Sequence, residues 1–284
     1  KPVPATLPVV VLTSSRDDND VSRAYQAGAS GFVRKSLTFE DFSADLRLTV
    51  RYWLEVNVAP ARDWDELLHN EYNPLVNKAV AGQYAPGSTF KIVVALAALA
   101  AGIQPSHQVF CPGVMNLGTA SFHCWKKEGH GTLSMVDGIK HSCDVYFYDV
   151  AHRTGIDAIA EMARRFGLGQ AEGLDLPGER IGVIPDRAWK QATMGEPWQP
   201  GETLVAGIGQ GFILATPLQL AVMTARLANG GHAVVPPLTR PAVGTADHTA
   251  SAAERFASMK IPPEMLRIVA EGMNRVTNDP RGTA

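Results

Sequence analysis

A serine and a lysine, Ser88 and Lys91, are three positions apart at the predicted start of an apolar helix, and together they could form an activated nucleophile. Ser88 and Lys91 belong to the stretch Pro-Gly-Ser-Thr-Phe-Lys, and residues 92–101 are all Ile, Val, Ala or Leu. Side chains three apart share one face of a helix. A serine hydroxyl becomes nucleophilic when a neighbouring base takes its proton, and burial favours the neutral amine of a lysine. The pair predicts acyl transfer at Ser88 with Lys91 as general base, beside free helix N-terminal N–H groups that can stabilise an oxyanion.

The same spacing has a structural alternative, an N-capping serine followed by a surface lysine. A second polar pair, Ser142 and Asp144, lies in the segment HSCDVYFYDVA, where it also fits a simple helix N-cap. In the catalytic interpretation, Ser142 passes a proton or bonds to Lys91, and Asp144 holds Lys91 or a substrate amide.

All three cysteines fall in one window together with a histidine, in the order Cys111, Cys124, His130 and Cys143. Thiolates and an imidazole are ligands that zinc prefers, and four of them suit a closed tetrahedral site. The spacing is not that of a standard zinc finger, so three buried free cysteines remain the alternative. Three cysteines are too few for a disulfide framework.

Hydrophobic periodicity predicts the elements that must position these side chains. A buried helix is expected from about Ser88 to Ala101, ended by Gly102, and residues 103–136 are turn-rich. Further helices are predicted over 156–166 before Gly167, over 216–229 with Thr216, Pro217 and Gln219 at its start, and over 263–276.

The first 58 residues have a different pattern. Strands are predicted over 8–12 and 31–33, and helices over 20–27 and 39–54, which is roughly half of a doubly wound α/β domain. Residues 59–63 are expected to form a linker, and residues 64–284 a second domain.

Composition excludes several classes of function. The chain has 284 residues, 45% of them hydrophobic and 19% charged, and a formal net charge of −2. This charge gives no reason to expect nucleic acid as a partner. No apolar run is long enough to span a bilayer, and the first residues do not form a signal peptide. The first residue is Lys1 rather than Met, so the chain is expected to be a fragment.

Residues 64–284 resemble the catalytic domain of class B penicillin-binding proteins. The stretch from Gly82 to Lys91 resembles their nucleophile motif, and Ser142-Cys143-Asp144 resembles their second motif. Other segments resemble the elongation-specific branch, penicillin-binding protein 2; they are WKKEGHG, ARRFGLG, GLDLPGE, GIGQGFILATPLQLA and NDPRGTA.

This resemblance implies an incomplete helical and antiparallel α+β fold and a serine D,D-transpeptidase that cross-links peptidoglycan. It implies stem peptides and β-lactams as ligands, elongation-machinery proteins as partners, and the periplasmic face of the bacterial inner membrane as location. Relatives carry a zinc near the active site, and two of its ligands match His130 and Cys143. Cys111 and Cys124 fall where the remaining ligands would sit. Alternatives are a serine β-lactamase, distinguished by fast deacylation, and a non-catalytic signalling module.

The family's third motif, Lys-Thr-Gly, does not occur in this sequence. Arg153-Thr154-Gly155 is similar but leads straight into a predicted helix, and we interpret it as a turn. In relatives the third motif follows shortly after the segment that matches NDPRGTA. Because the strand that bears it supplies part of the oxyanion hole, turnover by this polypeptide is expected to be weak or absent.

Residues 1–58 resemble the second half of a response-regulator receiver domain. Thr13 matches the switch hydroxyl, Phe32 the rotameric aromatic and Lys35 the lysine that contacts the phosphoryl group. The phospho-accepting aspartate belongs to the half that has no match here, so no phosphotransfer is expected. Receiver domains are cytoplasmic, whereas transpeptidases act in the periplasm. The two resemblances therefore suggest a fusion of two partial domains.

Overall fold

The computed structural model describes residues 10–13, 20, 23, 31–34, 66–174, 178–236 and 256–283. By its contacts the chain divides into two compact units, Lys1–Leu75 and Val76–Ala284. The sequence-based boundary at residues 59–63 lies outside the described residues and stays a prediction.

The first unit contains a parallel pair of strands. β1 (Val10–Thr13) pairs with β2 (Gly31–Arg34), and Val10 lies opposite Gly31. Both predicted strands are therefore confirmed within the described residues, and each continues one residue beyond its predicted end. Asp20 and Arg23 are helical, whereas the rest of the predicted helix 20–27 and all of 39–54 lie outside the described residues.

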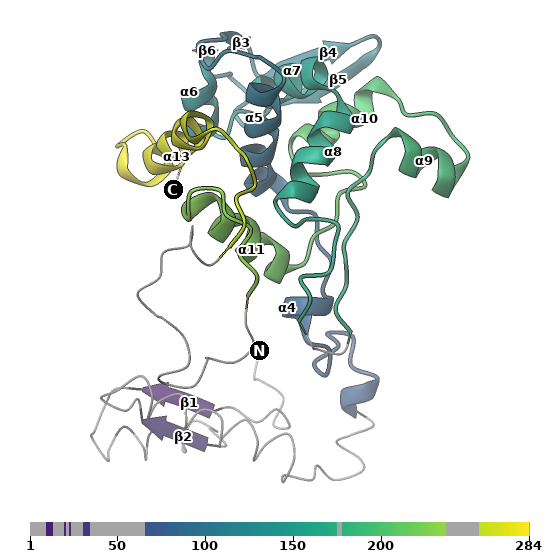
Figure 1. The fold of residues 1–284 in the computed structure, drawn as a ribbon, viewed down its shortest axis with the longest axis vertical. Coiled ribbons are helices and arrows are strands. Elements are labelled where there is room, and N and C mark those ends of the chain that lie inside the picture. The colour runs from purple at the N-terminus through teal and green to yellow at the C-terminus, as the bar shows by residue number, and fades with distance from the viewer. Residues whose placement is uncertain are drawn as a thin grey trace. The chain divides into compact units, whose positions relative to one another are not determined.

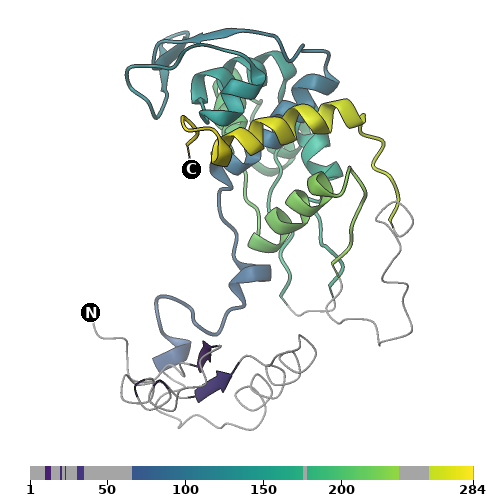
Figure 2. The same ribbon diagram turned by 90° about the vertical axis from the view of Figure 1, so that its left-hand side faces the viewer.

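The second unit is built around helix α5 (Lys91–Ala100), in which eight of ten residues are buried. A helix that is apolar on all sides is stable only when other elements surround it. α5 contacts α7 (Asp144–Thr154) and α8 (Ile156–Arg165), and Figure 1 shows it in the middle of this unit. Figure 2 shows α13 (Pro263–Asn278) with α11 (Pro217–Ala228) beneath it.

The other labelled helices of this unit, within the described residues, are short. They are α4 (Lys78–Ala81), the 3₁₀ turn η2 (Gly87–Phe90), α6 (Met135–Lys140), α9 (Arg187–Met194) and α10 (Pro200–Gly207). None of the helices in the described ranges combines the length and the apolar character that crossing a bilayer requires.

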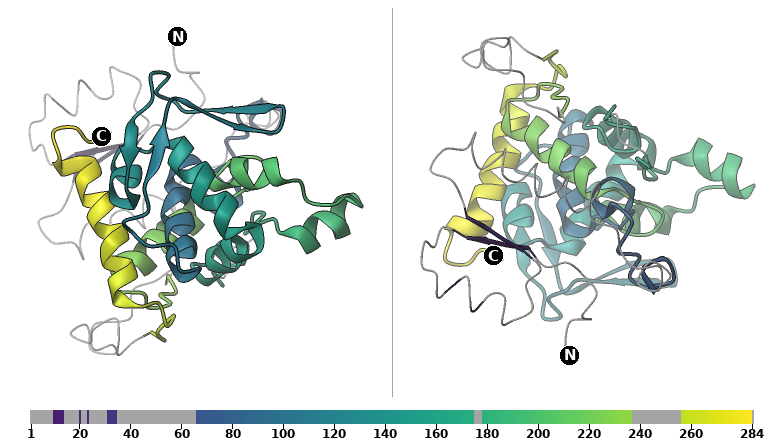
Figure 3. Two further views of the ribbon diagram at one scale, coloured as in Figure 1. Left: turned by 90° about the horizontal axis from the view of Figure 1, so that it is seen from above. Right: turned by 90° about the horizontal axis from the view of Figure 1, so that it is seen from below.

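The segment expected to be only turns contains four short strands. β3 (Val109–Cys111) pairs antiparallel with β6 (Gly131–Leu133), and β4 (Val114–Leu117) forms a hairpin with β5 (Ala120–His123). Strands of three or four residues between glycines carry too little periodicity to be predicted. Figure 3 shows the hairpin and α9 projecting from the helical cluster.

The predicted helix ends agree closely with the structure. Thr216 caps α11 by accepting a hydrogen bond from the Gln219 N–H, and the Gln219 side chain accepts one from the Thr216 N–H. α8 ends before Gly167. Gly155 separates α7 from α8, so Arg153-Thr154-Gly155 leads straight into a helix as predicted, but Arg153 and Thr154 are the last residues of α7 rather than a turn.

Candidate active site

Ser88 lies on a 3₁₀ turn rather than inside the α-helix that the sequence predicted. η2 spans Gly87–Phe90, and the α-helix proper begins at Lys91. The Thr89 hydroxyl donates to the Pro86 carbonyl at 2.7 Å and fixes this tighter turn. A 3₁₀ turn often leads into an α-helix. It leaves Ser88 exposed, whereas Lys91 is only 2% exposed.

Lys91 is held by three oxygen acceptors from the start of α7. Its Nζ donates to Asp144 Oδ1 at 2.7 Å, to the Ser142 carbonyl at 2.7 Å and to Ser142 Oγ at 3.0 Å. An ammonium has three N–H donors, so these contacts use all of them. Both side chains of the Lys91–Asp144 ion pair are largely buried, and this pair joins α5 to α7.

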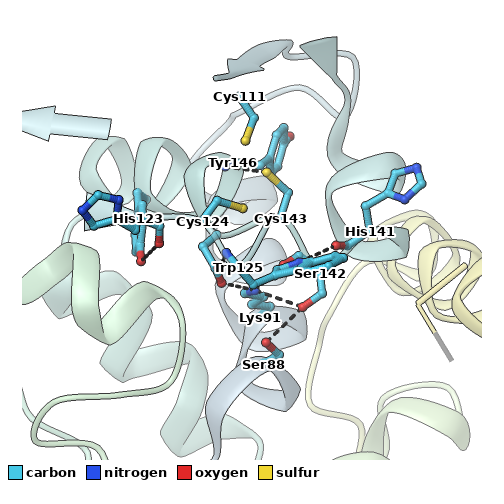
Figure 4. A network of polar contacts seen from close by, with 12 residues as sticks. Ser88, Lys91, Cys111, His123, Cys124, Trp125, His141, Ser142, Cys143 and Tyr146 are labelled. Atoms are coloured by element: carbon cyan, nitrogen blue, oxygen red, sulfur yellow. Dashed lines mark hydrogen bonds and ion pairs between the residues drawn. The ribbon is translucent and has the colours of Figure 1, made fainter. Parts of the chain in front are cut away.

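Ser142 bridges the candidate nucleophile and the lysine. Its hydroxyl donates to Ser88 Oγ at 3.0 Å while accepting from Lys91 Nζ, as Figure 4 shows. Ser142 has φ +46°, a left-handed conformation that is uncommon for a residue with a side chain and that tends to occur at functional sites. The structure thus provides a continuous polar path from Ser88 through Ser142 to Lys91.

The second carboxylate oxygen of Asp144 fixes the loop across the cleft. Asp144 Oδ2 accepts from the Trp125 N–H at 2.9 Å, and the Trp125 indole donates to the His141 carbonyl at 3.1 Å. The Asp144 carboxylate therefore binds Lys91 through one oxygen and the loop after β5 through the other. Cys143, between the two polar residues, caps α7 by accepting from the Tyr146 N–H.

A glycine from a distant segment supports the turn that carries Ser88. The Gly87 N–H donates to the Gly209 carbonyl at 2.9 Å. Gly209 has φ +72°, and a Cβ at this position would lie 2.2 Å from the Gly87 carbonyl oxygen. Only glycine combines this conformation with so close an approach.

The predicted cysteine and histidine ligands converge on one point. The ligand atoms of Cys111, Cys124, His130 and Cys143 all lie within 4.8 Å of one another. His130 Nδ1 is 3.6 Å from the sulfurs of both Cys111 and Cys124. Figure 4 shows the three sulfurs pointing toward one another on the far side of Ser142 from Ser88.

The chemistry of this cluster suits a cation. A hydrogen bond from Cys143 lowers the pKa of Cys124, and the same bond, together with burial, raises the pKa of Cys143. All three thiols are buried and free, and no disulfide joins them. His130 Nε2 is buried without a hydrogen-bond partner in the described part of the chain. Three sulfurs and one imidazole nitrogen are a donor set that zinc binds tetrahedrally.

The site opens into a cleft of about 1310 Å³ that is lined by Ser88, Ser142 and Asp144 but not by Lys91. Besides Ser88, Ser142 and Asp144, its lining includes residues that no catalytic prediction from the sequence singled out. They are His123, Trp125, Lys126, Glu128, His141, Tyr148, Ile208, Gln210, Arg281, Gly282 and Thr283. Several of these residues lie in the segments that resemble penicillin-binding protein 2. Their amino-acid types alone do not indicate that they line the same cleft.

A family model described as the penicillin-binding protein transpeptidase domain matches residues 55–284. Among curated proteins, the chain is 44% identical over 191 residues to the peptidoglycan D,D-transpeptidase MrdA of Acinetobacter baumannii, covering 66% of this chain and 28% of that protein. It is 37% identical over 240 residues to MrdA of Escherichia coli K12, covering 81% of this chain and 37% of that protein. The chain therefore spans about a third of the length of these relatives.

The chain is also similar to solved structures of PBP2 proteins. The Pseudomonas aeruginosa PBP2 in complex with WCK 5153 aligns with a TM-score of 0.70 and 40% identity, covering 79% of this chain and 51% of that one. The Helicobacter pylori PBP2 in complex with MreC aligns with a TM-score of 0.70 and 31% identity, covering 79% and 41%.

Proposed function

Because the chain belongs to the penicillin-binding protein transpeptidase family, we propose that its Ser88 is the nucleophile of the D,D-transpeptidase-type acyl transfer of peptidoglycan cross-linking. The observation that carries this proposal is the single Ser142 hydroxyl that contacts both Ser88 and Lys91. Asp144 and Lys91 fix that hydroxyl before a substrate arrives, which is the preorganisation that a proton relay requires.

In the proposed reaction, Ser88 Oγ attacks the carbonyl of the penultimate D-alanine of a stem peptide. Once the Lys91 ammonium has given up a proton, the Ser88 proton passes through Ser142 to the Lys91 amine and returns to the leaving nitrogen as the C–N bond breaks. D-Alanine departs and Ser88 carries the acyl ester. An acceptor amine then attacks the ester and forms the new C–N bond. The bond between Ser88 Oγ and the acyl carbon breaks, and a proton from the amine restores the Ser88 hydroxyl.

β-Lactams are proposed as ligands of the same serine. Their strained amide places an electrophilic carbonyl where the peptide carbonyl binds, so Ser88 opens the ring and retains the acyl group. A serine β-lactamase, the related alternative, would hydrolyse that ester quickly, whereas a transpeptidase-type site keeps it.

The test is labelling with a fluorescent penicillin, followed over time. We expect one label per chain, and we expect this label to persist much longer than the acyl-enzyme of a β-lactamase. A peptide ending in D-Ala-D-Ala should slow the labelling. A peptide ending in L-Ala-L-Ala is the matched control and should not compete. Rapid loss of label with release of hydrolysed penicillin would favour the β-lactamase alternative.

We also propose that Cys111, Cys124, His130 and Cys143 hold a structural zinc ion. Their four donor atoms fit its ligand preference, and four protein ligands complete a tetrahedral shell without a position for a substrate. Zinc would crosslink four points of the chain. Cys143 lies between Ser142 and Asp144, so a zinc ion bound to Cys143 would hold these two catalytic residues in place.

His130→Gln is expected to lower bound zinc from about one per chain toward zero. It should also lower the melting temperature by about 10 °C, since a ligand bound at 1,000 times its Kd contributes about 4 kcal/mol. Zinc content by mass spectrometry and thermal unfolding measure both effects. His152→Gln, at an exposed histidine outside the cluster, is the control. Purified wild-type protein without zinc and with three freely titrating thiols would contradict the proposal.

Partners and location are proposed from the relatives. A solved Helicobacter pylori homologue forms a complex with MreC, and we infer that the transpeptidase unit of this chain can contact elongation proteins of that kind. Action at the periplasmic face of the inner membrane follows from peptidoglycan as substrate.

For residues 1–58 we infer a receiver-like α/β fragment. The parallel pairing of β1 with β2 supports this inference, because parallel strands require a crossover connection. Thr13 lies at the end of β1 and Phe32 within β2, whereas Lys35 lies outside the described residues. A signalling role for this piece stays an alternative without a specific observation in its favour.

A further inference from the structure

One thiol of the cysteine cluster faces the cleft that holds Ser88. Cys124 is only 4% exposed, but it lines this cleft, whereas Cys111 and Cys143 do not. These other two cysteines are 1% and 0% exposed. A small molecule that enters the cleft therefore meets Cys124 before it meets either of the other thiols.

Cys143 is placed to react with an oxidised Cys124. The Cys143 thiol donates a hydrogen bond to Cys124, and the ligand atoms of the whole cluster lie within 4.8 Å of one another. The sulfurs of a disulfide are about 2 Å apart, so these two thiols need to approach by at most about 3 Å. Cys124 lies in the loop after β5 and Cys143 is the N-cap of α7, so a movement of the loop can bring their sulfurs together.

The same sulfurs are ligands of the proposed zinc ion. A thiolate that binds zinc has its reactive electron pair engaged by the metal, so zinc binding and disulfide formation compete for the cluster. The periplasm, where this chain is proposed to act, is an oxidising compartment in which disulfides form and persist. Loss of zinc there would expose the thiols to oxidation.

We propose that the cluster, when it binds no zinc, is a site of reversible oxidation at which hydrogen peroxide converts Cys124 and Cys143 to a disulfide. Cys124 Sγ attacks one peroxide oxygen, the O–O bond breaks, and Cys124 becomes a sulfenic acid while water leaves. Cys143 Sγ then attacks the Cys124 sulfur. The S–S bond forms, the S–O bond breaks, and the hydroxyl leaves with the Cys143 proton as a second water. The two thiols are oxidised by two electrons in total, and the peroxide is reduced to water.

The disulfide would join the loop after β5 directly to the start of α7, two segments that zinc would also connect. It would leave Cys111 as a free thiol beside His130, whose Nδ1 is 3.6 Å from the Cys111 sulfur. With two of the four ligands consumed, the oxidised cluster could not complete a tetrahedral zinc site. This inference extends the proposed zinc site and is independent of acyl transfer at Ser88.

The experiment treats the full chain with hydrogen peroxide, once with zinc bound and once after a chelator has removed it, with thermal unfolding to show that both samples are folded. Without zinc, the titratable thiols should fall from three to about one. Mass spectrometry of an unreduced chymotryptic digest should find the peptides of Cys124 and Cys143 joined, with a loss of about 2 Da. The zinc-bound protein should react at least about tenfold more slowly. Dithiothreitol should restore all three thiols.

Two controls accompany the measurement. Met194 is 44% exposed and should gain an oxygen in both samples, which shows that the peroxide has acted. Cys111→Ala removes the cysteine that the proposal leaves free, so this variant should still form the disulfide and lose both remaining thiols.

The outcomes separate this inference from the zinc proposal. Oxidation of Met194 in folded, zinc-free protein that keeps three thiols would overturn the inference, and so would a disulfide that includes Cys111. Equal rates of oxidation with and without zinc would overturn the protection by the metal. If the purified chain binds no zinc, the zinc proposal fails, but the same peroxide treatment of that protein still decides whether the disulfide forms.

Discussion

Ser88→Ala is expected to abolish covalent labelling by penicillin, because the variant lacks the only atom that the proposed reaction uses as nucleophile. Ser88 is exposed on its turn, and the alanine removes one hydrogen bond, from Ser142. Loss of an exposed hydrogen bond costs roughly 1 kcal/mol, so the variant should remain folded. Fluorescent labelling and thermal unfolding measure the two effects together.

The matched control is Ser121→Ala, at an exposed serine on β5 whose hydroxyl donates to Asn116 Oδ1 and likewise loses that hydrogen bond. Ser121→Ala should label at the wild-type rate. Labelling that persists in Ser88→Ala would assign the nucleophile to another residue and reject the proposed mechanism.

Lys91→Met is expected to slow acylation by about a thousandfold while leaving Ser88 in place. A general base contributes roughly 10² to 10⁴ in rate, and methionine fills a similar volume without accepting a proton. The variant also leaves Asp144 without its buried cation, which typically costs 3 to 5 kcal/mol. Acylation rates should therefore be measured at a temperature where the variant is folded.

Lys190→Met separates the chemical effect from the loss of stability. Lys190 is also only 3% exposed and paired with a carboxylate, Glu202, but it does not line the cleft. It should lose stability to a similar extent and keep acylation within a few-fold of wild type. A Lys91→Met protein that is folded and acylates as fast as Lys190→Met would exclude Lys91 as the base.

The sequence was most informative where the chemistry is local. Ser88 and Lys91 are three residues apart, and Ser142 and Asp144 are two apart, so each pair is visible as a pattern. The apolar run after Lys91 correctly predicted a buried helix. The capping residues of α11 were also predictable, because their hydrogen bonds join positions three apart.

Contacts between distant segments could not be predicted in the same way. The Thr283 hydroxyl bonds to a carbonyl 143 residues earlier in the chain, and no local pattern reports that contact. The close approach of Gly209 to Gly87 depends on how two segments pack. The 3₁₀ geometry at Ser88 differs from an α-helix by a single hydrogen-bond register, which propensity does not resolve.

The central claim, that this chain forms an acyl-enzyme at Ser88, is tested most directly by mapping the penicilloyl group by mass spectrometry. The account predicts one adduct per folded chain, on the proteolytic peptide that contains Ser88, and no adduct in Ser88→Ala. An unmodified wild-type protein, shown by thermal unfolding to be folded, would contradict the account, as would an adduct on any other peptide.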